Sequence, residues 1–166
     1  FFVNTRQILH YIDDERLQLT AKNYKDLPTL RTAIGNGRDG LYVLIHGWTD
    51  NHLAGYMSRY RSLLLSNGRF INPIAISVDW SNAAQHHFVG IEKSDESLIY
   101  SQSAADSLSV GREVGFLLYL IVKNNLLSAD TIHILEFHLG SHVAGFATEH
   151  YNRLALSHNA KIKSNP

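Results

Sequence analysis

The residues with the clearest chemical pattern lie at 132–147, in the stretch IHILEFHLGSHVAGFA. An apolar run leads into a tight turn and then into a segment with helical spacing. This is the setting in which a Gly-x-Ser-x-Gly elbow presents a nucleophilic serine. Here Gly140 takes the second glycine position, Glu136 replaces the first glycine, and His138 stands at the nucleophile position. The pattern predicts a nucleophile elbow without its hydroxyl.

His138 offers a different chemistry. An imidazole can attack activated esters, but it would need its own base and a carboxylate to orient it. We therefore interpret His138 as a residue that fills a former nucleophile position. An elbow also holds this residue at positive φ and requires small residues two places to either side. Gly140 meets that requirement and Glu136 does not, so either the turn has relaxed or the Glu136 side chain points into solvent.

Three apolar runs, at residues 41–45, 74–78 and 131–135, have the length of buried strands. A helix capped by Asp50 or Asn51 and ended by Gly68 follows the first run, and helices over about 103–123 and 141–152 flank the third. The apolar stripe of the first helix is predicted to lie in the core. It consists of Leu53, Tyr56, Met57, Tyr60, Leu63 and Leu64. The alternation of strands and helices favours an α/β fold with a mostly parallel sheet and helices on both faces.

Composition narrows the functional class. The 166 residues are enough for one domain with a real core. The formal net charge is zero and no basic stripe is present, which argues against a nucleic-acid partner. The chain has no cysteine, so disulfides and thiolate ligands are excluded. The apolar run at 114–122 is too short to span a bilayer, so no transmembrane segment is expected. Neither an initiator Met nor a signal-peptide pattern stands at Phe1, so we expect a processed chain or a fragment.

Five blocks of sequence resemble, in the same order, the N-terminal part of the neutral lipase family, which includes pancreatic lipases, insect and venom phospholipases A1, and insect yolk proteins. The blocks are FFVNTR at 1–6, LYVLIHGWTDN at 41–51, ISVDWS at 76–81, VGREVGFLLYLIVKNN at 110–125 and HLGSHVAGFA at 138–147. The resemblance implies one partial α/β-hydrolase domain over 1–166, truncated at its C-terminal side. It also implies hydrolysis of acylglycerol or phospholipid esters outside the cell, without a cofactor.

The resemblance also assigns positions in the site. The oxyanion hole of the family uses two backbone N–H groups, which fall here at Trp48 and Leu139. The family's acidic triad member lies in the strand after the elbow helix, and the nearest segment here, RLALSHNA at 153–160, places Ser157 at that position. The catalytic histidine of the family would fall beyond Pro166. No catalytic residue is therefore intact.

Three functions remain open. The first is an inactive lipase relative with a lipid-binding, storage or interaction role and a lipid or ester-like ligand. The second is an active carboxylic ester hydrolase with a divergent elbow, for which Ser141 is the first alternative nucleophile. The third is an inert fragment of a larger lipase.

Four further expectations come from single residues and segments. The spacing of His138, His142 and His150 would also suit zinc, but no other ligand is evident and we expect no metal. We interpret Asp79 as a cap for nearby backbone groups and His86-His87 as solvated residues. We expect the strand at 131–135 to lie at or near a sheet edge and to promote self-association.

Overall fold

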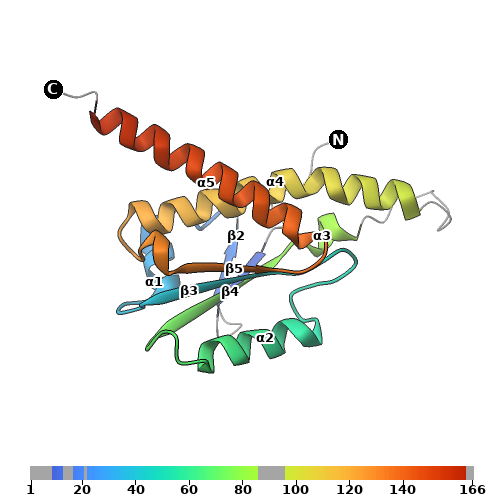
Figure 1. Cartoon of the computed structure of the whole chain (residues 1–166), viewed down its shortest axis with the longest axis horizontal. Coiled ribbons are helices and arrows are strands. Elements are labelled where there is room, and N and C mark those ends of the chain that lie inside the picture. The colour runs from blue at the N-terminus through green and yellow to red at the C-terminus, as the bar shows by residue number, and fades with distance from the viewer. Residues whose placement is uncertain (1–8, 13–16, 21, 86–95, 164–166) are drawn as a thin grey trace.

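The computed structural model describes residues 9–12, 17–20, 22–85 and 96–163 (Figure 1). Within these residues a five-stranded sheet has the order β2-β1-β4-β3-β5. Its strands are β1 (Leu9–Ile12), β2 (Leu17–Thr20), β3 (Gly40–Ile45), β4 (Pro73–Asp79) and β5 (Ile132–Glu136). The block at 1–6 and the pair His86-His87 lie outside the described residues.

The central strands of the sheet run parallel. Val43 of β3 lies between Ile76 of β4 and Ile134 of β5 in register. β1 and β2 extend the sheet beyond β4 with antiparallel pairing. Residues of β3 are buried on both faces, as expected for a strand covered by helices on both sides. The predicted α/β architecture is confirmed, and β5 is the edge strand of the described sheet, as expected.

Helices cover both faces of the sheet (Figure 1). The helices are α1 (Leu27–Ile34), α2 (Gly55–Ser66), α3 (Ser81–Ala84), α4 (Glu96–Lys123) and α5 (Gly140–Lys163), with a 3-10 turn at Ala129–Thr131. α2 lies on one face, whereas α4 and α5 lie on the other. Among the described helices none is long and apolar enough to cross a membrane.

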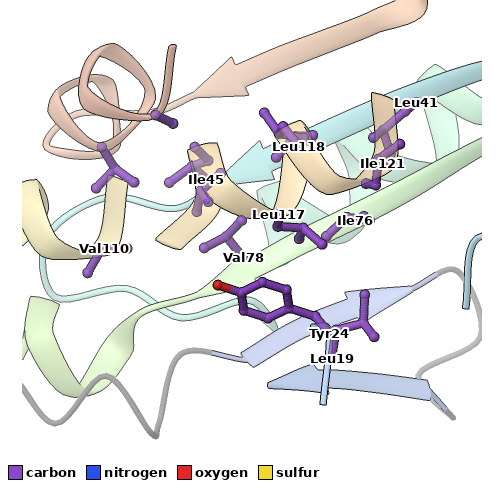
Figure 2. Close-up of a cluster of buried hydrophobic side chains, with 14 of the residues drawn as sticks. Leu19, Tyr24, Leu41, Ile45, Ile76, Val78, Val110, Leu117, Leu118 and Ile121 are labelled. Carbon is purple, nitrogen blue, oxygen red and sulfur yellow. The ribbon is translucent and has the colours of Figure 1, made fainter. Parts of the chain in front are cut away.

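The larger core lies between the sheet and the helices α4 and α5. Figure 2 shows Leu117 and Ile121 of α4 directed toward β4, where Ile76 and Val78 are fully buried. A smaller core lies under α2, where Met57 packs with side chains from β3 and β4. Packing on both faces thus holds the sheet, and it fixes the positions of the carboxyl ends of β3, β4 and β5.

The predicted core stripe of the first helix is wrong in three of its six positions. Met57 is buried, but Leu53, Tyr60 and Leu63 are 59%, 50% and 55% exposed. The helix begins at Gly55, after Ala54, instead of at the predicted caps. Three residues of the stripe, Tyr56, Met57 and Tyr60, line a groove between α2 and β5, and Leu53 and Leu63 lie outside it.

The segment at 153–160 also differs from the expectation. The resemblance placed it in a new strand, but α5 continues through it to Lys163. Ser157 is exposed on this helix, and the ring of His158 contacts the ring of Tyr119. With a helical rise of about 1.5 Å per residue, Ser157 lies roughly 26 Å along the axis from Gly140.

The contact between α4 and α5 depends on two glycines. A Cβ on Gly111 would lie 2.5 Å from Phe146 Cβ, and a Cβ on Gly115 would lie 2.4 Å from the carbonyl oxygen of Ala147. Real Cβ atoms do not approach other atoms so closely. The two backbones therefore cross at a separation that only glycine permits.

We predict that Gly115→Ala lowers the free energy of unfolding by roughly 1–3 kcal/mol, because the added methyl group meets backbone and forces the helices apart. Gly145→Ala is the matched control, since nothing lies within 4 Å of its added Cβ. That change should raise stability by about 0.5–1 kcal/mol through helix propensity. Urea unfolding measures both, and equal effects would show that the close crossing is not needed.

Candidate functional site

The elbow keeps its strained geometry without its serine. His138 has φ 52°, which is left-handed and uncommon for a residue with a side chain. Glu136 is exposed at the end of β5. Of the two alternatives that the sequence leaves open, the second therefore holds: the turn has not relaxed, and the Glu136 side chain reaches solvent.

Backbone contacts between β3 and the elbow explain why the turn is retained. A Cβ on Gly140 would lie 2.7 Å from the carbonyl oxygen of Ile45 and 2.8 Å from that of His46. The N–H of Phe137 donates to the carbonyl of Ile45 at 3.1 Å. The elbow is thus pressed against the end of β3, and Gly140 is the residue that allows this approach.

The two backbone donors assigned to an oxyanion hole flank this contact. Trp48 follows Gly47, and a Cβ on Gly47 would lie 3.0 Å from His138 Cβ. Leu139 follows His138 and stands directly before α5. Within the described part of the chain, neither the Trp48 nor the Leu139 N–H donates to a protein acceptor. Such backbone N–H groups suit a negatively charged oxygen, and the Leu139 N–H has the added advantage of a helix N-terminus.

Tyr56 holds the loop that carries Trp48. The N–H of Gly47 donates to the Tyr56 hydroxyl at 3.4 Å, and that hydroxyl donates to Asp50 Oδ2 at 2.9 Å. Burial, together with the hydrogen bond to Asp50, raises the pKa of Tyr56 to about 12, so the phenol stays protonated at neutral pH. The sequence placed Tyr56 in the core stripe, and no pattern there indicated its hydrogen bonds.

Gln85 holds the same loop from its other side. Its side-chain amide donates to the carbonyls of Thr49 and Asp50 at 2.7 and 2.9 Å. Thr49 has φ 64°, a second strained residue in this region. Because hydrogen bonds from two elements fix the loop, the Trp48 N–H is positioned before any ligand arrives.

A buried polar cluster anchors the start of the loop. The Trp80 N–H donates to His46 Nε2 at 3.1 Å, which makes Nε2 the unprotonated nitrogen of the ring. His46 Nδ1 then donates to the carbonyl of Gly47 at 2.9 Å. The indole of Trp80 donates to the carbonyl of His46 at 2.8 Å and stacks on the His46 ring.

Asp79 completes this cluster. Its Oδ1 accepts from the Ser81 N–H at 3.0 Å, so the predicted backbone cap is confirmed. Its Oδ2 also lies 2.8 Å from His52 Nδ1, a contact that the sequence did not suggest. Burial opposes ionisation of Asp79, but its hydrogen bonds with the Ser81 N–H and with His52 outweigh burial, so the pKa of Asp79 stays well below its ordinary value.

An apolar groove of about 330 Å³ adjoins the elbow. It lies between α2 and β5 and is lined by Leu44, Ile45, Tyr56, Met57, Tyr60, Leu135, Glu136 and Phe137. The Phe137 side chain is 53% exposed, and its ring lies 5.0 Å from that of Tyr56. On the other side of the elbow, Tyr100 of α4 contacts both the Trp48 and the His138 rings.

The remaining sequence candidates are not brought together with the elbow. The hydroxyl of Ser141 donates to the His138 carbonyl at 2.8 Å, so it serves the helix terminus instead of facing a base. His142 is exposed on α5. His138, His142 and His150 form no ligand set: among the described residues no group of three or more side chains could hold a metal.

We predict that Asp79→Asn lowers the free energy of unfolding by roughly 1.5–3 kcal/mol at pH 7, because a charge-assisted contact is lost. The folded-state pKa of Asp79 is lowered, so its contribution is complete above the unfolded value of about 3.9 and is lost as the pH falls through the folded value. The difference between the variant and the natural chain should therefore shrink in acid. Urea unfolding at several pH values tests this, and a difference that grew in acid would contradict it.

The fold agrees with comparisons to known proteins. A family model described as Lipase matches residues 2–162. Hepatic triacylglycerol lipase from Mus musculus is 28% identical over 145 residues, which are 86% of this chain and 26% of that protein. Phospholipase A1 4 from Polistes dominula is 28% identical over 120 residues, which are 72% of this chain and 36% of that protein.

The chain thus spans about a quarter to a third of the length of these relatives. The family model, in contrast, matches nearly all the residues of this chain. It includes the β3 end, the loop after it and the elbow between β5 and α5. The chain belongs to the lipase family.

Proposed function

We propose that this chain is one partial lipase-like domain that has lost catalysis and binds a lipid or ester-like ligand outside the cell. One observation carries the proposal: the elbow keeps its strained turn and both backbone donors, while the nucleophile position holds His138. The extracellular location rests on the resemblance to the neutral lipases. A storage or interaction role is compatible with binding without turnover.

Loss of catalysis is supported by what surrounds His138. An acyl-transfer nucleophile needs a base within hydrogen-bonding reach and a third group that orients the base. No hydrogen bond joins the His138 ring to a carboxylate among the described residues. Position 157, assigned to the former acidic triad member, lies roughly 26 Å along α5 from the elbow and cannot serve it.

Ligand binding is supported by the groove beside the elbow. The N–H groups of Trp48 and Leu139 suit the oxygen of a carboxylate or ester head, and the groove between α2 and β5 suits an acyl chain. Tyr60 and Phe137 expose half or more of their surface along it. A single-chain lipid would cover these side chains and bring its head to the donors.

We predict that His138→Ser restores no ester hydrolysis. The new hydroxyl would sit at a correctly strained turn, but among the described residues no base is hydrogen-bonded to position 138, and loss of triad members costs on the order of 10⁶ in turnover. Adding Glu136→Gly should change nothing, because Glu136 already points to solvent. Hydrolysis of p-nitrophenyl esters and labelling by a serine-directed organophosphonate measure this for both variants and the natural chain.

Saturable turnover by the natural chain, blocked by the organophosphonate, would instead favour an active ester hydrolase with Ser141 as nucleophile. Turnover by His138→Ser alone would show that a base lies within reach. His142, in the first turn of α5, would then be the candidate. His158 is excluded as that base, since it lies roughly 27 Å along the helix from Gly140.

We predict that Tyr60→Ser and Phe137→Ser each weaken binding of a fluorescent long-chain fatty acid by roughly tenfold, because each removes apolar surface from the groove. Leu156→Ser is the matched control, since Leu156 is 70% exposed on α5 and lines no part of the groove. Fluorescence titration measures all three. Equal fatty-acid affinities in all three variants would show that the groove does not bind the acyl chain.

We also propose that the β5 edge supports self-association. Its outward backbone groups have no neighbouring strand in the described sheet. Sedimentation velocity over a concentration series should show dimers or larger species. A natural chain that stays monomeric at the highest concentration reached would refute this part.

A further inference from the structure

We propose that a small cavity between α4 and α5 binds a phosphate-sized oxyanion. The cavity has a volume of about 50 Å³ and lies apart from the elbow and its groove. It is lined by Leu108 and Arg112 of α4 and by Phe146, Glu149, His150 and Arg153 of α5. His150 lies roughly 15 Å along α5 from Gly140, so the elbow chemistry does not use this site.

The helix crossing builds the cavity. Gly115 brings α4 against α5 so closely that a Cβ at this position would lie 3.1 Å from His150 Cβ. The His150 side chain thus lies beside the crossing of the two helices, and its Nδ1 atom is buried without a hydrogen-bond partner among the described residues. A buried ring nitrogen without a partner is costly, and an oxygen in the cavity would satisfy it.

The charge of the cavity favours an anion. Arg112 of α4 and Arg153 of α5 both line it, so two exposed arginines from separate helices border the cavity. Arg153 also pairs with Glu149 Oε1 at 2.5 Å in an exposed contact, which partly offsets the Glu149 charge and leaves further N–H donors on the guanidinium group. Two guanidinium groups and an imidazole are the donors that planar or tetrahedral oxyanions prefer.

The charge state of His150 should respond to the ligand. Burial lowers the pKa of His150, and the positive charges of Arg153 and Arg112 lower it further, while Glu113 and Glu149 act in the opposite direction. Burial and the two arginines thus disfavour the imidazolium form of His150. A bound oxyanion would offset the two arginines and stabilise the imidazolium, so oxyanion affinity should rise as the pH falls.

Histidine-labelled protein titrated with sulfate, followed by NMR, tests this directly. Sulfate keeps its charge across the range in which histidine titrates, so any pH dependence comes from the protein. We expect the His150 ring signals to shift saturably and its pKa to rise with sulfate. Arg112→Gln and Arg153→Gln should each weaken binding roughly tenfold, as expected for one lost charge-assisted hydrogen bond.

Arg59→Gln is the matched control, because Arg59 is exposed on α2 and lies outside the cavity lining. The proposal is overturned if His150 signals do not respond to sulfate, or if Arg59→Gln weakens binding as much as the cavity variants. Inorganic phosphate and vesicles containing phosphatidic acid separate the two sources of a phosphate group. Binding of inorganic phosphate identifies a soluble ligand, and vesicle binding lost in Arg112→Gln identifies a lipid headgroup.

Discussion

The close backbone contact between the end of β3 and the elbow is the constraint on which the site depends. At Gly140 the α5 terminus passes within van der Waals reach of the carbonyls of Ile45 and His46. β5 pairs with β3 up to Glu136, so the chain has only three residues in which to turn into α5. A turn that short requires one residue at positive φ, and His138 takes that conformation regardless of its own chemistry.

The same constraint explains why the two backbone donors are present although position 138 is not a serine. A backbone N–H does not depend on the side chain of its residue, so substitution at position 138 leaves the Leu139 donor in place. The Trp48 donor is held separately, by Tyr56 and Gln85, neither of which belongs to a triad. The His46 and Asp79 cluster fixes the start of that loop from below. The side chain at position 138 can therefore change without moving either backbone donor.

The order and type of the central elements could be predicted because short apolar runs and helical spacing are local signals. The elbow could be predicted for the same reason, from Gly140 and its context. Burial on α2 could not, because it depends on what lies beside the β5 edge, and Tyr60 and Leu63 have the same pattern whether covered or exposed. Ser157 was misplaced because an alignment of RLALSHNA carries no information on whether α5 continues. The roles of Tyr56, Gln85 and His52 depend on contacts between residues far apart in the chain, and residue spacing in the sequence does not indicate such contacts.

The replacement of the first elbow glycine by Glu136 follows from the position of β5. A side chain at this point would normally be confined between the strand end and its surroundings. On an edge strand one side is open, and Glu136 is exposed while the turn after it keeps φ 52° at His138. A charged residue at the end of an edge strand also discourages uncontrolled pairing with other chains. The side chains of Ile132, Ile134 and Leu135 pack against the two cores, so Glu136 is the charged residue at the end of this strand.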